Sequence, residues 1–586
     1  MTTSPASSLT PLTPDPSTRS WWRSAVVYQV YPRSFADSDG DGVGDLRGLT
    51  SRLGHLARLG VDVVWLSPIY PSPGSDNGYD ISDYRAVDPA LGTLADFDEM
   101  LAQAHGHGIR VILDLVVNHT SDEHPWFVES RSSRDSPKRG WYWWRPPRPG
   151  LAVGEPGAEP TNWESFFSGP TWTLDEATGE YYLHLFHAKQ PDLNWENPEV
   201  RREVHAVMRW WLDRGVDGFR MDVINLISKD PALPDGPPNG RGALGDGFEH
   251  YGTGPRVHEF LQEMHREVFE GRGAELLTVG EMPGVTVEEA ARFTDPARRE
   301  LSMVFQFEHV SLDHGPAGKF DPVPLDLRDL KASLGRWQAG LADRGWNSLY
   351  LCNHDQPRAV SRFGDAQRWW RESATALATV LHLHRGTPFV YQGEELGMTN
   401  APFASIASMR DVEAVRHHAT AVALGQDPDV VWRGLLAMGR DHARTPMQWD
   451  GSPHAGFTTG EPWLEVNPNH AWLNAAAQYD DEASVFHHYR RLIELRHTLP
   501  VVVDGDFTML VADHPTVYAF VRRLDDETLT VVANLSGAPE DVPEEVLEAG
   551  AGPGDMVLAN YVEPGPTATL APWEARVYRA AGAATR

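Results

Sequence analysis

The chain has 586 residues, of which 41% are hydrophobic and 10% aromatic, a composition that supports a large core and excludes general disorder. The net charge of −31 argues against a nucleic-acid partner and against an anionic membrane surface. The single cysteine, Cys352, excludes an internal disulfide framework and a cysteine-based zinc cluster. Residues 1–20 lack the pattern of a signal peptide and are expected to form a disordered tail, so we expect a cytoplasmic protein that does not span a membrane.

From Trp21 onward, short β-rich segments alternate with longer amphipathic segments, which is typical of βα units around a parallel sheet. The predicted strands cover 25–31, 61–67, 110–117, 216–222, 276–281, 349–352 and 387–391, and the clearest helices cover 49–59, 94–106 and 198–214. About 100 residues separate the third strand from the fourth, and the part from about 119 to 195 is rich in Trp, Pro and Gly and long enough for a small domain. Residues 400–470 form a second irregular insertion, and short alternating strands after about 505 indicate a separate antiparallel β module.

Chemically active side chains gather where these strands end, which is where barrel enzymes carry their catalytic groups. The positions are occupied by Asp114, Asn118, His119, Arg220, Asp222, Glu281, His354 and Asp355. Arg220 and Asp222 point the same way along a strand, and a neighbouring arginine favours the ionised carboxylate. Several acids in one pocket should raise the pKa of at least one of them. One ionised and one protonated carboxyl group are what retaining glycoside hydrolysis needs, although any single acid among them could simply cap a helix or pair with a surface base.

Six segments carry a resemblance to the α-amylase superfamily of glycoside hydrolases, family 13: DLVVNH (114–119), QPDLNW (190–195), GFRMD (218–222), GE (280–281), NHD (353–355) and GTPFVYQGEE (386–395). The resemblance implies Asp222 as the nucleophile, Glu281 as the general acid and base, and Asp355 as a stabiliser of the transition state. His119, Arg220 and His354 would line the same subsite. The expected α/β fold is a (β/α)8 TIM barrel (21–118 and 196–505), with a small domain inserted after strand 3 (119–195) and a C-terminal antiparallel β-sandwich domain (506–586).

Within that superfamily the chain looks most like the oligo-1,6-glucosidases, dextran glucosidases and α-glucosidases, through WWRSAVVYQVYPRSF (21–35), NGYDISDY (77–84) and ARTPMQWD (443–450). This resemblance implies that Asp80 and Arg444 hold the terminal glucose and close one end of the pocket, which makes the enzyme exo-acting. Alternatively, Asp80 caps a turn and Arg444 forms a surface salt bridge. Val223 follows the nucleophile, and in this group valine there accompanies α-1,6 links, so isomaltose-type substrates are expected. Val223 could also be an ordinary β-branched residue at a strand end.

The segment DSDGDGVGD (37–45) has carboxylates at alternate positions, but Gly48 stands where an EF-hand needs its glutamate. The resembling glucosidases bind calcium in this loop, which implies Asp37, Asp39, Asp41, the Val43 carbonyl and Asp45 as ligands. Oxygen ligands suit a structural Ca²⁺, with Mg²⁺ as the alternative. A solvated acidic turn without a metal is the other interpretation, and no organic cofactor is implied.

Three other functions remain open. A sucrose isomerase or α-glucosyltransferase would use the same covalent intermediate, and a trehalose-6-phosphate hydrolase would need a basic pocket, for which Lys189 and Arg358 are the candidates. A catalytically inactive relative, like the ectodomains of amino-acid transporters, would lack the three acids that this chain keeps. The expected partner is a small oligosaccharide substrate, and the expected assembly is a monomer or homodimer.

Overall fold

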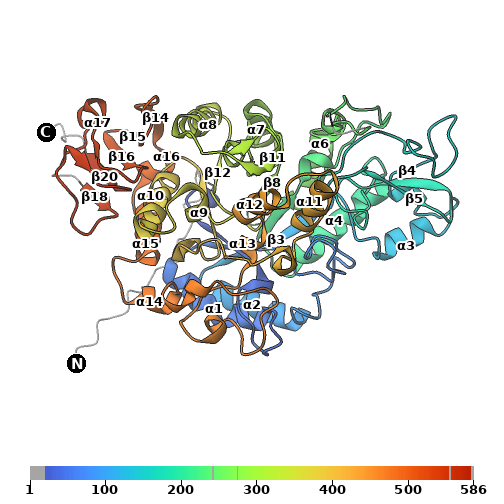
Figure 1. Cartoon of the computed structure of the whole chain (residues 1–586), viewed down its shortest axis with the longest axis horizontal. Helices are drawn as coiled ribbons and strands as arrows, with labels where there is room; N and C mark the ends of the chain where they lie inside the picture. The colour runs from blue at the N-terminus through green and yellow to red at the C-terminus, as the bar shows by residue number, and fades with distance from the viewer. Residues whose placement is uncertain (1–19, 241–242, 274, 553–555, 582–586) are drawn as a thin grey trace.

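A closed ring of parallel strands forms the centre of the molecule (Figure 1). The computed structural model describes residues 20–240, 243–273, 275–552 and 556–581, so the predicted tail lies outside the described residues except for its last position. The strands follow the order β12-β13-β1-β2-β3-β7-β8-β9, and a parallel bridge between Val304 and Asn347 joins the two ends. This confirms the predicted TIM barrel. Its strands are β1 (Val27–Val30), β2 (Val63–Leu66), β3 (Arg110–Val116), β7 (Gly218–Asp222), β8 (Leu277–Glu281), β9 (Met303–Phe305), β12 (Ser348–Leu349) and β13 (Thr387–Tyr391).

Amphipathic helices surround the ring, and all but α6 and α10 of those listed below begin at a side-chain cap that the sequence supplies. The Asp45 carboxylate caps the first of them, which ends at Gly60 in the left-handed conformation. Thr93 and Asp96 form a reciprocal capping box on the second. The helices that follow the eight strands are α1 (Leu46–Leu59), α2 (Leu94–Gly106), α4 (Pro198–Asp213), α6 (Val257–Met264), α7 (Val287–Phe293), α8 (Leu327–Gly340), α10 (Trp370–His382) and α15 (Val485–Thr498).

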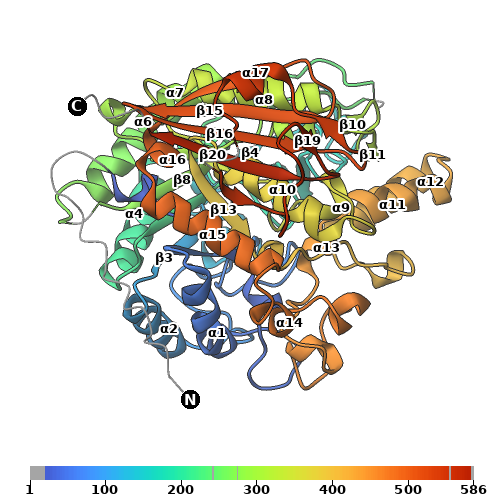
Figure 2. The same cartoon turned by 90° about the vertical axis from the view of Figure 1, so that its left-hand side faces the viewer.

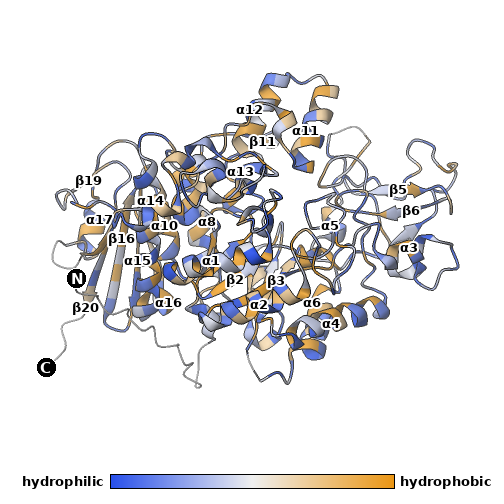
Figure 3. Ribbon diagram, turned by 90° about the horizontal axis from the view of Figure 1, so that it is seen from below, coloured by the Kyte–Doolittle hydropathy of each residue, from blue (hydrophilic) through white to orange (hydrophobic). Residues whose placement is uncertain are grey.

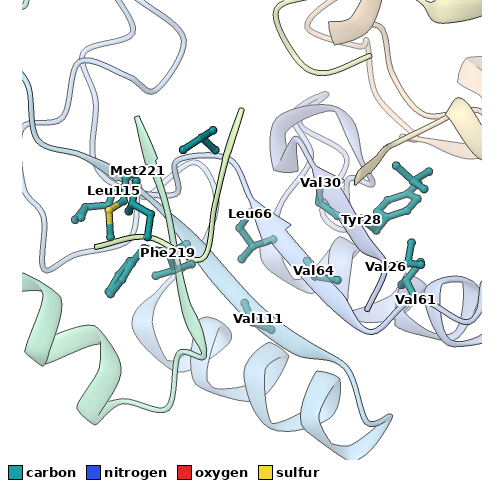
Figure 4. Close-up of a cluster of buried hydrophobic side chains, with 14 of the residues drawn as sticks. Val26, Tyr28, Val30, Val61, Val64, Leu66, Val111, Leu115, Phe219 and Met221 are labelled. Carbon is teal, nitrogen blue, oxygen red and sulfur yellow. The ribbon is translucent and has the colours of Figure 1, made fainter. Parts of the chain in front are cut away.

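Alternation along the strands divides the core into two layers. One set of side chains packs between strands and helices, and Figure 4 shows its members on β1, β2, β3 and β7 or just before these strands: Val26, Tyr28, Val30, Val61, Val64, Leu66, Val111, Leu115, Phe219 and Met221. The residues between them, including Val63, Trp65 and Ile112, form a separate buried cluster inside the barrel. Because side chains alternate, Arg220 lies between two outward residues and points inward.

A small antiparallel sheet lies between β3 and α4, inside the predicted domain 119–195. It has the order β4-β6-β5 and is accompanied by the helix α3 (Pro125–Arg131). In Figure 1 it lies at one end of the long axis, opposite the C-terminal strands. The strands are β4 (Trp144–Arg145), β5 (Trp172–Asp175) and β6 (Glu180–Leu183).

A buried lysine ties this inserted segment to the barrel. Lys229 Nζ lies 2.9 Å from an Asp192 carboxylate oxygen, and both side chains are fully buried. The same ammonium donates to Asn118 Oδ1 at 2.9 Å and to the Leu226 carbonyl at 2.8 Å. The Lys229 ammonium therefore joins the chain just after β3, the end of the inserted segment and the segment after β7.

Replacing that lysine should strongly destabilise the protein. Lys229→Met leaves the Asp192 carboxylate buried without its cation, which costs about 3–5 kcal/mol. We expect a clearly lower midpoint of urea unfolding. Lys138→Met is the matched control, because Lys138 pairs with Glu129 at the partly exposed surface of the same segment, where such a pair contributes about 0–1 kcal/mol. Equal midpoints for the two variants would contradict the stabilising role of Lys229.

The C-terminal part is antiparallel, as predicted. A five-stranded sheet has the order β14-β15-β16-β20-β18. A separate antiparallel pair, β17-β19, comes from the connections on either side of β18. Lys331 on α8 donates to the carbonyls of Val511, His514 and Val517 and so fastens this part to the barrel. The elements are β14 (Asp506–Leu510), β15 (Val517–Leu524), β16 (Glu527–Asn534), β17 (Glu540–Asp541), α17 (Glu544–Glu548), β18 (Met556–Ala559), β19 (Thr569–Leu570) and β20 (Ala575–Ala581).

The segment 400–470, expected to be irregular, contains two helices of more than ten residues, α11 (Val412–Ala423) and α12 (Pro428–Met438). Figure 2 shows this helical hairpin projecting from the body of the molecule. It packs against β11 (Gly318–Pro322), where Phe320 lies 4.4 Å from the ring of His417. In the ranges that the structure covers, none of the helices combines the length and the apolar character needed to cross a bilayer.

Candidate active site

Three acids and one arginine meet at the carboxyl ends of β3, β7 and β8. Asp114 lies opposite Arg220 in the register of β3 and β7, and Asp222 is the next inward position on β7. Arg220 Nη1 donates to Asp114 at 2.8 Å and to Asp222 at 2.7 Å, and its Nη2 lies 2.6 Å from Glu281. All four residues are buried. The barrel therefore brings the predicted Asp222, Glu281 and Arg220 together, with Asp114 as an additional member.

Burial changes the titration of this cluster. Loss of hydration raises the pKa of Glu281 to about 8, because it outweighs the attraction of Arg220 and is reinforced by the negative charge of Asp222. Burial also raises the pKa of Asp222, again against the effect of Arg220, and a hydrogen bond joins Asp222 to Glu281. The cluster can thus keep a proton near neutral pH, and Glu281 is the group best placed to carry it.

Asp355, the third predicted acid, is the most exposed of the three, with 26% of its side chain accessible. Its amide donates to Asn353 Oδ1, which fixes the turn after β12. The guanidinium groups of Arg440 and Arg444 lie 3.1 and 2.9 Å from its Oδ1. Burial alone would raise the pKa of Asp355, but neighbouring His354 and the two arginines lower it well below its usual range. This carboxylate is therefore ionised at neutral pH.

His354 is held as a neutral hydrogen-bond donor. Gln29 Nε2 donates to His354 Nδ1 at 2.8 Å, which leaves the proton on Nε2, 3.3 Å from Asp355. Burial lowers the pKa of His354 to about 3. Its ring stacks on Tyr79 with centroids 5.1 Å apart, and the Tyr79 hydroxyl donates to Asp114 at 3.0 Å. Tyr79, which lies within the NGYDISDY segment but was absent from the predicted site, connects the two groups of acids.

His119 lies on the same wall of the site. Its Nε2 is 3.1 Å from the Tyr79 carbonyl, and burial lowers the pKa of the ring to about 4. Gln190 Nε2 lies 3.2 Å from His119 Nε2 and donates to Asp76 at 3.1 Å. The ring of Phe186 packs 5.2 Å from that of His119. The wall therefore combines neutral polar groups with an aromatic face.

The structure corrects the prediction for Asp80. Both of its carboxylate oxygens accept hydrogen bonds from its own loop: Oδ1 from the Ser72 hydroxyl and the Asp76 amide, and Oδ2 from the Ser75 amide. Asp80 is fully buried, so it caps a turn, the alternative that the sequence allowed. Asp76 instead contacts Arg440, the arginine that also contacts Asp355: Asp76 Oδ1 lies 3.4 Å from Arg440 Nη2. Burial raises the pKa of Asp76 to about 7, against the lowering effect of Arg440.

The prediction for Arg444 needs a similar correction. Arg444 is only 1% exposed, so it forms no surface salt bridge and presents no free face to a sugar. Its Nε donates to the His354 carbonyl at 3.1 Å, and its Nη2 donates to Asp355 at 2.9 Å. Arg440 is the N-cap residue of the short helix α13 (Asp441–Arg444) and lies one helical turn before Arg444. It is Arg440 that contacts both Asp76 and Asp355. Asp76 and Arg440 thus form the contact beside Asp355, whereas Asp80 is bonded within its own loop.

Val223 adopts a strained backbone conformation directly after Asp222. Its φ and ψ of 35° and 43° lie in the left-handed region, which costs a β-branched residue about 1–3 kcal/mol. In this conformation the Val223 amide donates to Glu281 Oε2 at 3.1 Å. The side chain is 8% exposed, at the edge of a cluster that includes Trp143 and Tyr251. The strain therefore aims a hydrogen-bond donor at Glu281.

The acidic loop before α1 gathers three carboxylates into a candidate cation site. One carboxylate oxygen each of Asp37, Asp39 and Asp45 lies within 4.8 Å of the others. Asp41 is not part of this group, and its Oδ1 accepts from the Val43 amide at 2.8 Å. A set of carboxylate oxygens at this spacing fits a hard cation such as Ca²⁺.

The two residues considered for phosphate binding are engaged elsewhere. Lys189 Nζ lies 3.5 Å from Glu123 at the surface. Arg358 is buried and donates to the carbonyls of Gln392, His442 and Ala443. Neither residue contributes a charge to the cluster of acids described above.

A parallel barrel that carries paired buried carboxylates at the ends of β7 and β8 defines a glycoside hydrolase. A model of the α-amylase catalytic domain matches residues 29–505, and the chain belongs to this family. It is 54% identical over 568 residues to an oligo-1,6-glucosidase from Parageobacillus thermoglucosidasius, covering 96% of this chain and 99% of the relative. The crystal structure of a trehalose-6-phosphate hydrolase from Bacillus licheniformis is similar with a TM-score of 0.88 and 44% identity, covering 96% and 100% of the two chains. A trehalulose synthase variant is similar with a TM-score of 0.89 and 42% identity, at the same coverage.

Proposed function

We propose that the protein is a retaining, exo-acting α-glucosidase that releases terminal glucose from short α-glucosides and prefers α-1,6 links. The observation that carries the proposal is the sharing of one guanidinium, Arg220, by Asp222 and Glu281. Retaining enzymes need two carboxyl groups close together, since one must attack the carbon whose bond to the leaving oxygen the other protonates. The 54% identity to an oligo-1,6-glucosidase over nearly the whole chain supports the linkage preference.

In the proposed first step, an Asp222 oxygen attacks the anomeric carbon while Glu281 gives its proton to the glycosidic oxygen, and the aglycone leaves. In the second step, Glu281 takes a proton from water, the water oxygen attacks the anomeric carbon, and the ester to Asp222 breaks. Asp355, ionised between two arginines, is suited to grip sugar hydroxyl groups and to stabilise the positive charge of the transition state. His354, neutral with its proton on Nε2, is suited to donate to a further hydroxyl group. The Nε2 proton of His119 is directed to the Tyr79 carbonyl, so His119 would line the same subsite without donating to the sugar.

We also propose that Asp76 and Arg440 bind the terminal glucose and close that end of the pocket. Their contact, together with the ring of Phe167 5.3 Å from the Arg440 guanidinium, places a charged pair and an aromatic face beside Asp355. A pocket closed at one end accepts a chain terminus, which supports exo action.

The linkage preference has a direct test. We expect a higher kcat/KM for isomaltose than for maltose, and we expect Val223→Thr to move that ratio toward maltose, because its hydroxyl would face the incoming aglycone. The effect should be about 10-fold, the value of one or two contacts in a substrate pocket. Timed product analysis on both sugars measures it, with Val285→Thr, on the loop after Glu281, as the matched control.

An equal or greater kcat/KM of the unchanged protein on maltose would overturn the α-1,6 preference. The same assay on trehalose-6-phosphate and on sucrose separates the alternatives. Glucose 6-phosphate from the first, or isomaltulose and trehalulose from the second, would replace the proposal with the activity named for a similar protein of known structure. The engagement of Lys189 and Arg358 with protein partners supports a neutral substrate.

For the acidic loop we propose a structural Ca²⁺ held by Asp37, Asp39 and Asp45, with Asp41 and the Val43 carbonyl completing the set. The spacing of the three carboxylates supports this. The cation would neutralise the loop that leads into α1, and no catalytic step depends on it.

Calcium should therefore raise the melting temperature. At about 100 times the dissociation constant, binding stabilises a folded protein by about 2.7 kcal/mol, which for a chain of this length we expect to appear as a Tm higher by about 2 °C in protein first stripped with EDTA. Asp39→Asn should abolish the increase, whereas Asp526→Asn, an exposed turn residue in the C-terminal sheet, should keep it. A Tm of stripped protein that does not respond to calcium would count against the metal.

A further inference from the structure

The carboxylate of Asp411 lies behind the proposed glucose site and is fully buried. Its Oδ1 accepts from Arg440 Nε at 2.9 Å and lies 3.3 Å from Arg444 Nη1. Its Oδ2 accepts from the Ala414 amide at 3.1 Å and so caps α11. One side chain therefore joins the first turn of the projecting hairpin to both arginines that hold Asp355.

Each arginine is held from two sides. Toward the barrel mouth, Arg440 and Arg444 contact Asp355, and Arg440 also contacts Asp76. On the other side, Asp411 is the carboxylate that they share. Long, flexible side chains lose precision when one of their anchors is removed, and a small displacement of groups around a reacting centre can cost about 100-fold in rate.

The backbone before α11 is held in the same place. The amides of Arg410 and Asp411 both donate to Asp441 Oδ2, and Asp441 directly follows Arg440. Glu413, in the first turn of the helix, lies 3.4 Å from Arg440 Nε and 2.7 Å from Lys319 on β11. The start of α11 is thus fastened to the arginine pair, whereas the hairpin α11–α12 projects from the rest of the molecule in Figure 3.

We propose that Asp411 is a positioning residue for the reaction: without touching the sugar, it fixes Arg440 and Arg444 so that Asp355 and Asp76 meet the terminal glucose in the reactive arrangement. This inference rests on the proposed glucosidase function. It also means that the seating of the α11–α12 hairpin and the geometry of the glucose site depend on the same carboxylate.

Two substitutions separate positioning from helix capping. Asp411→Asn and Asp411→Ser remove the charge but keep a residue that caps helices well. Asp427→Ala is the matched control, because Asp427 caps α12 through the Asp429 amide, is exposed, and lies on the same hairpin. All variants are compared at least about 20 °C below their own Tm, so that the folded enzyme is measured.

We expect kcat/KM on isomaltose to fall by about 30- to 100-fold in both Asp411 variants, through a higher KM as well as a lower kcat, and to stay within twofold in Asp427→Ala even where its Tm is lower. A normal kcat/KM in a folded Asp411 variant would overturn the proposal, and so would an equal loss in Asp427→Ala. Calorimetric binding of glucose gives a readout that does not need turnover: it should weaken at least about 10-fold only in the Asp411 variants. If the unchanged protein cleaves no glucoside, the proposed function fails, whereas unchanged glucose affinity in Asp411→Asn would reject the positioning role alone.

Discussion

Asp222→Asn is expected to reduce glucose release from isomaltose by at least about 10⁴-fold, the loss typical of removing a nucleophile. The amide lacks the negative charge that attacks the anomeric carbon, and the bond that it would form is not the ester on which the second step depends. Arg220 keeps Asp114 and Glu281 as partners, so the site should remain folded. Timed product analysis on isomaltose measures the loss.

Asp83→Asn is the matched control for this prediction. Asp83 is exposed and accepts from the Arg85 amide, a bond that asparagine can also make, so its activity should equal that of the unchanged protein. More than about 1% residual activity in folded Asp222→Asn, against the loss expected for a nucleophile, would move that role to another residue. Asp114 would then be the first candidate, since it shares the same arginine Nη1.

Glu281→Gln should have the second largest effect, with two signatures of a lost proton donor. Isomaltose loses about 10³-fold in kcat/KM, because a sugar leaves poorly without a proton. A p-nitrophenyl α-glucoside should lose far less in the same step, because nitrophenolate leaves without protonation. Added azide should restore its turnover, because azide attacks the intermediate without a general base.

The pH dependence follows from the same residue. Because burial raises the pKa of Glu281 to about 8, the protonated donor is present below that pH and is lost as the pH rises through it. The unchanged enzyme should therefore lose kcat/KM on isomaltose above about pH 8, and the residual kcat/KM of Glu281→Gln on isomaltose should lack this limb. Glu288→Gln, an exposed residue in the first turn of α7, should keep the limb. A limb that survives in Glu281→Gln would assign the proton to a different group.

Most of the barrel could be predicted because its strands are apolar runs bounded by turn residues. The strand β9 was missed, since three residues, Met303–Phe305, are too few for a pattern to develop. The hairpin α11–α12 was also missed, although Asp411 and the pair Asp427 and Pro428 are ordinary helix-start signals. The glycines and prolines around these helices suggested an irregular segment, whereas the two N-cap residues mark where the helices begin.

In the site, sequence motifs located the right segments but not always the right side chains. Arg440 and Arg444 are four residues apart, and so are Asp76 and Asp80. Helical or turn geometry puts either member of such a pair on nearly the same side, and the contacts across the barrel decide which one reaches the other. Only the fold shows that Asp76 meets Arg440, whereas Asp80 is taken up by its own loop.

The contact between β9 and β12 depends more on particular side chains than the other strand contacts of the barrel do. Around most of the ring, backbone ladders hold neighbouring strands, and such bonds tolerate almost any side chain. At the join, an isolated bridge is supplemented by side chains: the Ser348 hydroxyl donates to the Val304 carbonyl at 2.7 Å, and the Tyr350 hydroxyl donates to the Gln306 carbonyl at 2.6 Å. Closure of the ring between β9 and β12 therefore depends partly on the side chains of Ser348 and Tyr350, which a substitution can remove. Substitutions at these two positions can change the stability of the closure, while the strands that carry Asp222 and Glu281 keep their register.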